Sequence, residues 1–268
     1  MLPPVVGLSW VEKHRHELVL ADVRWYLDGR SGRDAFALGH LPGAVFIDLE
    51  HCLSGDPRAG RGRHPLPGPA TFATGMASAG ISDASTVVGY DDQGGVIAAR
   101  LVWMLRATGH EAALLDGGLQ AYGRGLATGF PTVPAGQFSP RPWPEEKLAD
   151  IAAATSPDNV VVDARPAARY HGEDEHVDPR AGHIPGAVSL PCRENLASDG
   201  MFLPVAALRR RFEAAGISPS SHVVSYCGSG VSACHNLLAL ELCGLGEARL
   251  YPGSWSEYST RYDAPAAT

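Results

Sequence analysis

Short apolar runs alternate along this chain with longer segments whose apolar positions recur at helical spacing. Val160–Asp163 and Val223–Tyr226 are typical of short buried strands, because each is a four-residue, largely apolar run followed by turn-forming or polar residues. The same pattern predicts two more strands and two helices, the first helix stopped by a glycine: strands 188–190 and 249–251, helices 203–215 (before Gly216) and 231–242.

This alternation of strands and helices predicts an α/β fold, a mostly parallel sheet with helices on both faces. In such sheets ligands bind beyond the carboxyl ends of the strands. Tyr226 ends a predicted strand, so the residues after it are the first place to look for chemistry.

The chain also repeats itself. Gly39–Val45 (GHLPGAV) recurs as Gly182–Val188 (GHIPGAV), and an apolar run ending in Asp-x-Arg precedes each copy. The repeat unit is about 115 residues, too long for a solenoid repeat, and therefore indicates a duplicated domain. Three further landmarks keep the same order in both copies: 22–24 and 163–165, 87–90 and 223–226, 115–122 and 251–258.

Between the copies lies a proline-rich stretch that cannot form a helix and favours an extended connection. We therefore expect three parts. Residues 10–128 form the first domain, 129–150 a linker, and 151–265 the second domain.

Composition narrows the function classes. The formal charge of −7 and the absence of a basic run argue against nucleic-acid binding. No apolar stretch is long enough to span a membrane and no signal peptide precedes the domains, so we expect a cytoplasmic protein. The five cysteines show neither a CxxC pair nor zinc-finger spacing, so we expect reduced thiols, no metal and no cofactor.

Of the five cysteines, Cys227 has the position that most favours a chemical role. It leaves a predicted strand, enters a small glycine-serine loop and precedes a helix, and backbone N–H groups in such a loop can hold a thiolate or a sulfur-bearing anion. Packing is the alternative explanation for a cysteine at a strand end. The first copy has Asp91 there and no thiol, so only the second copy could perform cysteine chemistry. The expected cradle consists of Gly228, Ser229, Gly230, Val231 and Ser232.

Tandem domains with the Gly-His-[Leu/Ile]-Pro-Gly-Ala element and one cysteine loop resemble the rhodanese superfamily. The loop Cys-Gly-Ser-Gly-Val-Ser-Ala is most similar to that of 3-mercaptopyruvate sulfurtransferases, whereas animal thiosulfate sulfurtransferases carry Arg and Lys after the cysteine. The resemblance implies a sulfurtransferase whose Cys227 takes sulfur from 3-mercaptopyruvate as a persulfide. A thiol, cyanide or reduced thioredoxin would then accept that sulfur. Thiosulfate as the donor is the alternative.

The resemblance also implies other site residues. Arg169 matches the arginine that holds the substrate carboxylate, and Arg180 is the nearest match to a second one. Asp48, His64 and Ser229 match a proton relay beside the cysteine.

Other residues have structural interpretations. His40 and His183 occur in both copies and are expected to fix turns rather than to act in catalysis, and Cys234 and Cys243 are expected in the core. Trp255 is expected to pack near the cysteine loop. For the arginines before His64, a solvated loop is favoured over added positive potential at the domain interface; they are Arg58, Arg61 and Arg63.

Two other function classes remain to be weighed. A dual-specificity phosphatase needs an arginine six residues after its cysteine, and that position is Ala233. A non-catalytic sulfur carrier or binding module would not require the complete loop around Cys227.

Overall fold

The computed structural model describes residues 2–57 and 60–268, which fall into two compact units. Each unit corresponds to one copy of the repeat, except that each includes a short segment from the other copy. The first unit contains Met1–Gly55, Leu66–Trp143 and Ser198–Phe202. The second contains Asp56–Pro65, Pro144–Ala197 and Leu203–Thr268.

The first unit is built on a parallel sheet whose strands, within the described residues, run in the order β1-β5-β4-β2-β3. Its strands are β1 (Val5–Val6), β2 (Leu18–Asp22), β3 (Val45–Phe46), β4 (Thr86–Tyr90) and β5 (Ala112–Leu115). Its helices are α1 (Leu8–Lys13), α2 (Gly32–Leu38), α3 (Leu49–Cys52), α4 (Pro69–Ser78) and α5 (Ala98–Ala107), with 3-10 turns η1 (Arg15–Glu17) and η3 (Gly118–Tyr122).

The second unit has the same plan in the order β7-β6-β8-β9, again all parallel. Its strands are β6 (Val160–Asp163), β7 (Val188–Ser189), β8 (His222–Tyr226) and β9 (Glu247–Leu250). Its helices are α6 (Ile151–Ala154), α7 (Ala167–Tyr170), α8 (Val205–Ala214), α9 (Ala233–Cys243) and α10 (Ser254–Tyr258), with 3-10 turns η4 (Glu145–Lys147) and η5 (Cys192–Asn195). Among the described residues, no helix is long and apolar enough to cross a membrane.

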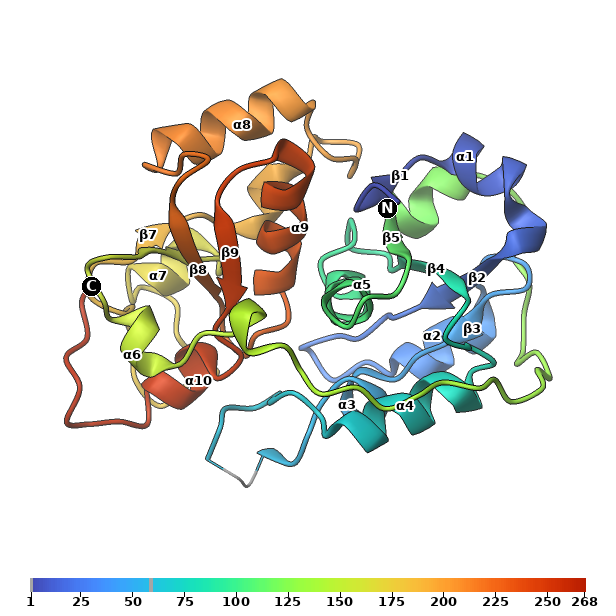
Figure 1. The fold of residues 1–268 in the computed structure, drawn as a ribbon, viewed down its shortest axis with the longest axis horizontal. Helices are drawn as coiled ribbons and strands as arrows, with labels where there is room; N and C mark the ends of the chain where they lie inside the picture. Colours follow the sequence, from blue (N-terminus) through green and yellow to red (C-terminus); the bar gives the residue numbers. More distant parts are fainter. Residues whose placement is uncertain (1, 58–59) are drawn as a thin grey trace. The chain divides into compact units, whose positions relative to one another are not determined.

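Helices cover both faces of the second sheet, as predicted. On one face Val224 and Tyr226 pack in a core with Trp255 and Tyr258 of α10. On the other face α9 packs on β8 and β9 with α8 beside it, and Ser225 Oγ donates to the carbonyl of Ala233 at 3.1 Å (Figure 1). Alternate residues of β8 therefore serve opposite layers, and the strand is buried on both sides.

The predicted strands and helices of the second copy agree with the structure to within two residues. The strand expected at 160–163 is β6, and the helix expected over 203–215 is α8, which ends before Gly216. Gly216 has a φ of +83°, the left-handed conformation that commonly ends helices. The strand expected at 249–251 lies two residues earlier, at Glu247–Leu250.

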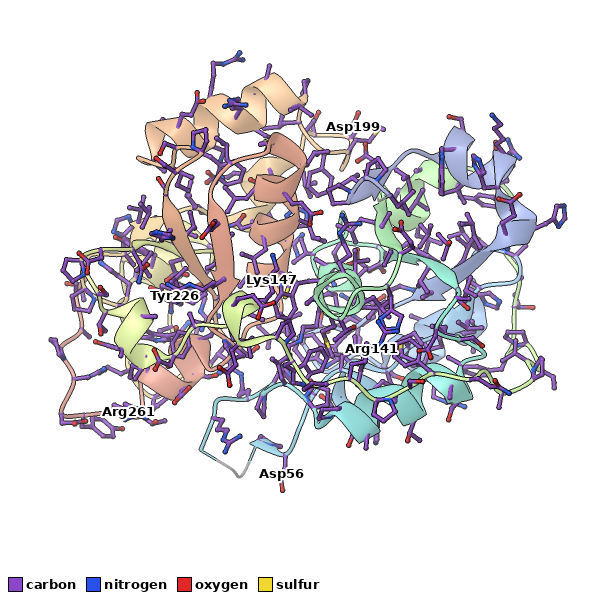
Figure 2. All side chains as sticks on the ribbon, viewed as in Figure 1. Asp56, Arg141, Lys147, Asp199, Tyr226 and Arg261 are labelled. Carbon is purple, nitrogen blue, oxygen red and sulfur yellow. The ribbon has the colours of Figure 1, made fainter. Side chains whose placement is uncertain are left out.

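A buried polar network, repeated in both units, ties the ends of two strands to the Gly-His turn. We call it the strand-end network: Asp22, Arg24 and Tyr90 in the first unit, and Asp163, Arg165 and Tyr226 in the second. Arg165 Nη2 lies 2.6 Å from Asp163 Oδ2 and donates to the carbonyl of Gly182 at 2.7 Å. Tyr226, which is inside the second unit (Figure 2), accepts a hydrogen bond from the backbone N–H of Ile184 at 3.1 Å.

His40 and His183 make equivalent contacts in the two units. His40 Nδ1 lies 2.9 Å from the carbonyl of Phe36, and His183 Nδ1 lies 2.9 Å from the carbonyl of Tyr170. Each ring also stacks on the aromatic ring of that same residue. The prediction that both histidines fix turns is confirmed.

Residues 129–143 contain neither helix nor strand, and they pack against the first unit. Phe138 packs on Phe72 with ring centroids 5.6 Å apart, and Ser139 Oγ donates to Asp83 at 2.7 Å. Trp143 Nε1 donates to the carbonyl of Pro67 at 2.7 Å. The extended chain is therefore stabilised by contacts as well as by its prolines.

The strand-end network generates a stability prediction. Tyr226→Phe removes the hydroxyl that accepts from Ile184 N–H and bonds to the buried Asp163 carboxylate. We expect the free energy of unfolding of the second unit to fall by about 1–3 kcal/mol, the cost of leaving buried polar groups unpaired. Denaturant unfolding measures it, with the exposed Tyr262→Phe as the control. Equal unfolding curves for the two variants would contradict the role assigned to the network.

Candidate functional site

Cys227 begins the loop that follows β8, at the carboxyl end of the second sheet. We call residues 227–232 the cysteine loop. The Cys227 thiol is buried, and its Sγ accepts a hydrogen bond from the backbone N–H of Gly230 at 3.1 Å. Gly230 has a φ of +76°, which turns its N–H back toward the sulfur and suits a glycine. The N–H of Gly230 therefore lies toward the sulfur, as expected of the cradle.

Helix α10 anchors the start of this loop. The N–H of Cys227 donates to Ser254 Oγ at 3.1 Å, and its carbonyl accepts from the N–H of Trp255 at 2.9 Å. The carbonyl of Gly228 accepts from the N–H of Ser256 at 2.8 Å. Ser254 adopts a φ of +53°, uncommon for a residue other than glycine, at this junction. The predicted packing of Trp255 near the loop is confirmed; the roles of Ser254 and Ser256 were not foreseen.

Val231 and Ser232 complete the turn into α9. Their carbonyls accept from the N–H groups of Cys234 and His235 at 3.1 Å each, so the loop passes directly into the helix. Cys234 and Cys243 are buried on α9, as predicted. The positive end of this eleven-residue helix starts just after the thiol, a favourable place for an anion.

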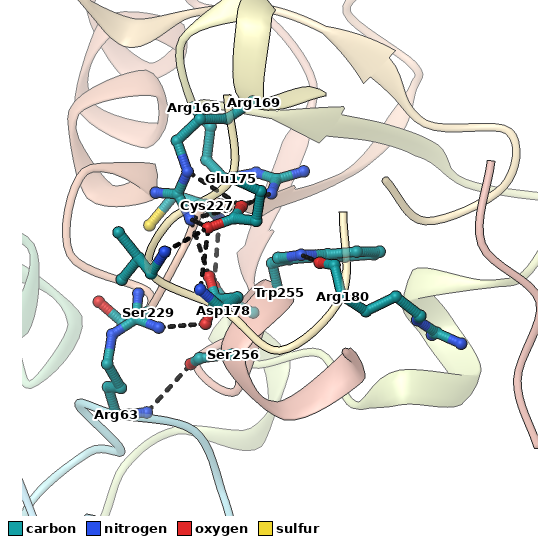
Figure 3. Close-up of polar contacts among 12 residues, drawn as sticks. Arg63, Arg165, Arg169, Glu175, Asp178, Arg180, Cys227, Ser229, Trp255 and Ser256 are labelled. Atoms are coloured by element: carbon teal, nitrogen blue, oxygen red, sulfur yellow. Dashed lines mark hydrogen bonds and ion pairs between the residues drawn. The ribbon is translucent and has the colours of Figure 1, made fainter. Parts of the chain in front are cut away.

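Arg169 lies in a cluster of buried ion pairs beside the loop (Figure 3). Its Nη2 lies 2.8 Å from Glu175 Oε2 and 2.8 Å from Asp178 Oδ2. Arg165 is in the same cluster, 3.4 Å from Glu175 as well as paired with Asp163. Arg169 was predicted to bind the substrate carboxylate, whereas the two protein carboxylates that pair with it were not predicted.

Glu175 is kept ionised in this cluster. Burial raises the pKa of its carboxyl, but hydrogen bonds from the backbone N–H of Asp178, from Arg169 and from the N–H of Val177 outweigh that effect and lower it overall. Glu175 therefore positions Arg169 and also closes the turn at 175–178.

Two guanidinium groups approach Gly228. A Cβ at this position would lie 3.0 Å from Arg63 Nη2 and 3.4 Å from Arg169 Nη1. Positive charge therefore reaches the residue next to the thiol from two separate segments. Arg63 also pairs with Asp178 through Nη1 and Oδ1.

His64 and Ser229 are brought together. His64 Nδ1 lies 2.8 Å from Ser229 Oγ, and both side chains are buried. The neighbouring Arg63 holds the segment in place, since its N–H donates to Ser256 Oγ at 3.0 Å. The favoured interpretation of the arginines as a solvated loop is wrong for Arg63; Arg61 is exposed, and Arg58 lies outside the described residues.

Asp48 and Arg180 make different contacts from those the resemblance implied. Asp48 belongs to the first unit and caps α3, accepting from the N–H groups of Glu50 and His51 at 2.9 and 3.0 Å. Arg180 Nη1 donates to the carbonyl of Ala264 at 2.8 Å, and its guanidinium points away from Cys227 (Figure 3). Asp48 therefore stabilises the start of α3, and Arg180 binds the C-terminal segment.

A second buried thiol, Cys192, lies near Cys227. Burial raises the pKa of Cys192 to about 12, and the neighbouring Cys227 adds to the effect. Cys192 therefore stays protonated at neutral pH, which leaves Cys227 as the thiol that the cysteine loop addresses.

The corresponding loop of the first unit holds a buried carboxyl group in place of the thiol. Asp91 stands where Cys227 stands and is fully buried. Its Oδ1 accepts from the N–H groups of Gln93 and Gly95 at 2.7 and 2.8 Å, and its Oδ2 from Ile97 and Ala98 at 2.7 and 2.9 Å. The Asp91 carboxyl group thus accepts from four backbone N–H groups of this loop.

Comparisons with known proteins agree with the two-domain organisation of the chain. The model of the rhodanese-like domain matches residues 8–124 and again 145–261. A Pseudomonas aeruginosa protein provisionally named 3-mercaptopyruvate sulfurtransferase is 44% identical over 264 residues, covering 94% of this chain and 93% of its own. A Mycobacterium tuberculosis protein provisionally named thiosulfate sulfurtransferase is 41% identical over 253 residues, covering 90% and 87%. The solved 3-mercaptopyruvate sulfurtransferase of Leishmania major superposes with a TM-score of 0.88 at 31% identity, covering 98% of this chain and 76% of that one.

The four hydrogen bonds of Asp91 predict a large effect on stability. Asp91→Ala leaves four buried N–H groups without their acceptor, so we expect the free energy of unfolding of the first unit to fall by about 3 kcal/mol or more. Thermal and denaturant unfolding measure the loss. Asp28→Ala, which removes an exposed carboxylate of the same unit, is the matched control. A loss no greater than that of the control would contradict the assignment.

Proposed function

The chain belongs to the rhodanese-like family of sulfurtransferases, and from that premise we propose that it moves the sulfur of 3-mercaptopyruvate to a thiophilic acceptor through a Cys227 persulfide. One observation carries the proposal: the thiol, the cradle N–H of Gly230 and two guanidinium groups meet at the cysteine loop. A sulfur nucleophile and a place for a carboxylate are what this donor requires.

Arg169 and Arg63 are the residues that would hold the donor's carboxylate. Both guanidinium groups lie against Gly228, next to the thiol, and a planar guanidinium can bind a carboxylate through two N–H groups. A carboxylate bound there places the reacting end of a three-carbon donor near Cys227. Arg180, tied to the C-terminal segment, is not included in this set.

The first half-reaction breaks the carbon–sulfur bond of the donor. The Cys227 thiolate attacks the donor's sulfur, a sulfur–sulfur bond forms, and the electron pair of the carbon–sulfur bond passes to the carbon fragment as the enolate of pyruvate. The enolate takes up a proton to give pyruvate, and Cys227 carries the sulfur as a persulfide.

His64 and Ser229 are the groups that would deliver this proton. Their 2.8 Å contact is a hydrogen-bonded pair beside the loop, and histidine exchanges protons near neutral pH. Asp48 was expected in the same relay; its proposed role stays a prediction, because its observed contacts are those of a helix cap.

The second half-reaction restores the thiolate. A nucleophilic acceptor attacks the outer sulfur, forms its own bond to it, and the electrons of the sulfur–sulfur bond return to Cys227. Cyanide would leave as thiocyanate, and a thiol or reduced thioredoxin as a persulfide. The cysteines of the described structure are all free thiols, which suits the cytoplasmic location that we propose.

Thiosulfate remains the second candidate donor, because a relative with that name is 41% identical to this chain. The cysteine loop favours 3-mercaptopyruvate: Gly228 and Ser229 add no positive charge, and the nearby guanidiniums are already paired with carboxylates. Such a site suits a donor of one negative charge better than a dianion.

Replacing the nucleophile tests the proposal directly. We expect Cys227→Ser to abolish thiocyanate release from cyanide with either donor, because the hydroxyl cannot form the persulfide. The measurement is kcat/KM for 3-mercaptopyruvate and thiosulfate on one preparation, and the wild type should prefer 3-mercaptopyruvate. Cys52→Ser, a thiol of the first unit, should leave both values unchanged. Activity retained in Cys227→Ser would exclude the mechanism.

If His64 delivers a proton, its replacement should affect the reactions with the two donors differently. His64→Gln should lower kcat with 3-mercaptopyruvate by about 100-fold, a typical general-acid effect. With thiosulfate it should have little effect, because the departing sulfite needs no proton. A steady-state comparison with both donors decides it, and an equal loss with both would indicate a purely structural role.

A further inference from the structure

We infer that Asp178 is a specificity-determining residue of this site: as the shared counter-ion of Arg63 and Arg169, it makes the site select a singly charged donor over a doubly charged one. The inference rests on the proposed function, because it concerns the choice between the two sulfur donors.

Asp178 occupies an unusual position between two segments. Its side chain is 1% exposed, its Oδ1 pairs with Arg63 Nη1, and its Oδ2 lies 2.8 Å from Arg169 Nη2. The two guanidiniums that Asp178 joins are the same two that approach Gly228, one residue from the thiol. One carboxylate therefore bridges both groups that face the donor.

The charges of this cluster balance. Within the described part of the chain, its ion pairs join three guanidiniums, those of Arg63, Arg165 and Arg169, to three carboxylates. Those carboxylates are Asp163, Glu175 and Asp178. A thiolate at Cys227 then adds a negative charge that a second anion must approach. Because the Coulomb energy grows with the product of the charges, thiosulfate is opposed more strongly than a monocarboxylate.

Of the three carboxylates, Asp178 can be neutralised with the least disturbance of the fold. Asp163 belongs to the strand-end network, and Glu175 accepts from two backbone N–H groups of its own turn. The carboxylate oxygens of Asp178 bind the two guanidiniums. The negative charge of Asp178 therefore lowers the electrostatic potential at the place where a donor anion would bind.

The test is to remove this charge and keep the shape. In Asp178→Asn, kcat/KM for thiosulfate relative to that for 3-mercaptopyruvate should rise about tenfold, because a dianion gains more than a monoanion from one uncompensated guanidinium. Asp178→Glu should keep the wild-type ratio. Asp174→Asn removes an exposed carboxylate from the same loop and should also leave the ratio unchanged.

Different results would contradict the role of Asp178 and the proposed sulfurtransferase activity. A folded Asp178→Asn protein with an unchanged ratio, or with equal losses for both donors, would overturn the inference while leaving the sulfurtransferase proposal intact. Wild-type protein inactive with both donors would overturn the proposed function itself.

A measurement on the unaltered protein keeps the inference testable should the variant not fold. Pyruvate should protect Cys227 from alkylation by iodoacetamide at a lower concentration than sulfate does, since pyruvate carries one charge and sulfate two. The reverse order would overturn the inference.

Discussion

The structure depends on how each unit provides acceptors for the buried N–H groups at the carboxyl end of its central strand. Parallel strands β4 and β8 both run into a tight loop that leads to a helix, and backbone N–H groups of that loop turn inward. Such groups cannot be left buried without an acceptor. In the first unit the acceptor is the carboxylate of Asp91, and in the second it is the sulfur of Cys227. One constraint therefore accounts for the group that each loop encloses.

The rest of each unit places this loop. The strand-end networks fix the ends of β2 and β6 next to the central strands, with the same pairing of Asp, Arg and Tyr in both units. The shared scaffold means that the difference in chemistry is local. A change from aspartate to cysteine and a loop shorter by one residue distinguish the two cradles.

Much of this could be predicted from the sequence, and the reason lies in local patterns. The strand at β6, the helix at α8 and the position of Cys227 follow from short-range periodicity and from the repeat. The ion pair of Arg63 with Asp178 joins residues 115 positions apart, and no periodicity reports such a contact. Ser254 and Ser256 lay within a recognised repeat landmark, but their bonds to the cysteine loop follow from the fold of the second unit rather than from their spacing.

The same limit explains the residues assigned by resemblance. Matching a motif identified Arg169, but it could not show that Glu175 and Asp178 already neutralise this arginine. For Asp48, the local sequence is also that of a helix cap, and the bonds to the N–H groups of Glu50 and His51 show that it serves as one.

Residues 56–65 group with the second unit although they belong to the first copy of the repeat. This segment carries the histidine that touches Ser229 and the arginine that pairs with Asp178. A second copy produced alone would lack both contacts, so the two halves of the chain are not interchangeable modules, and separating them at the linker would alter the surroundings of the cysteine loop.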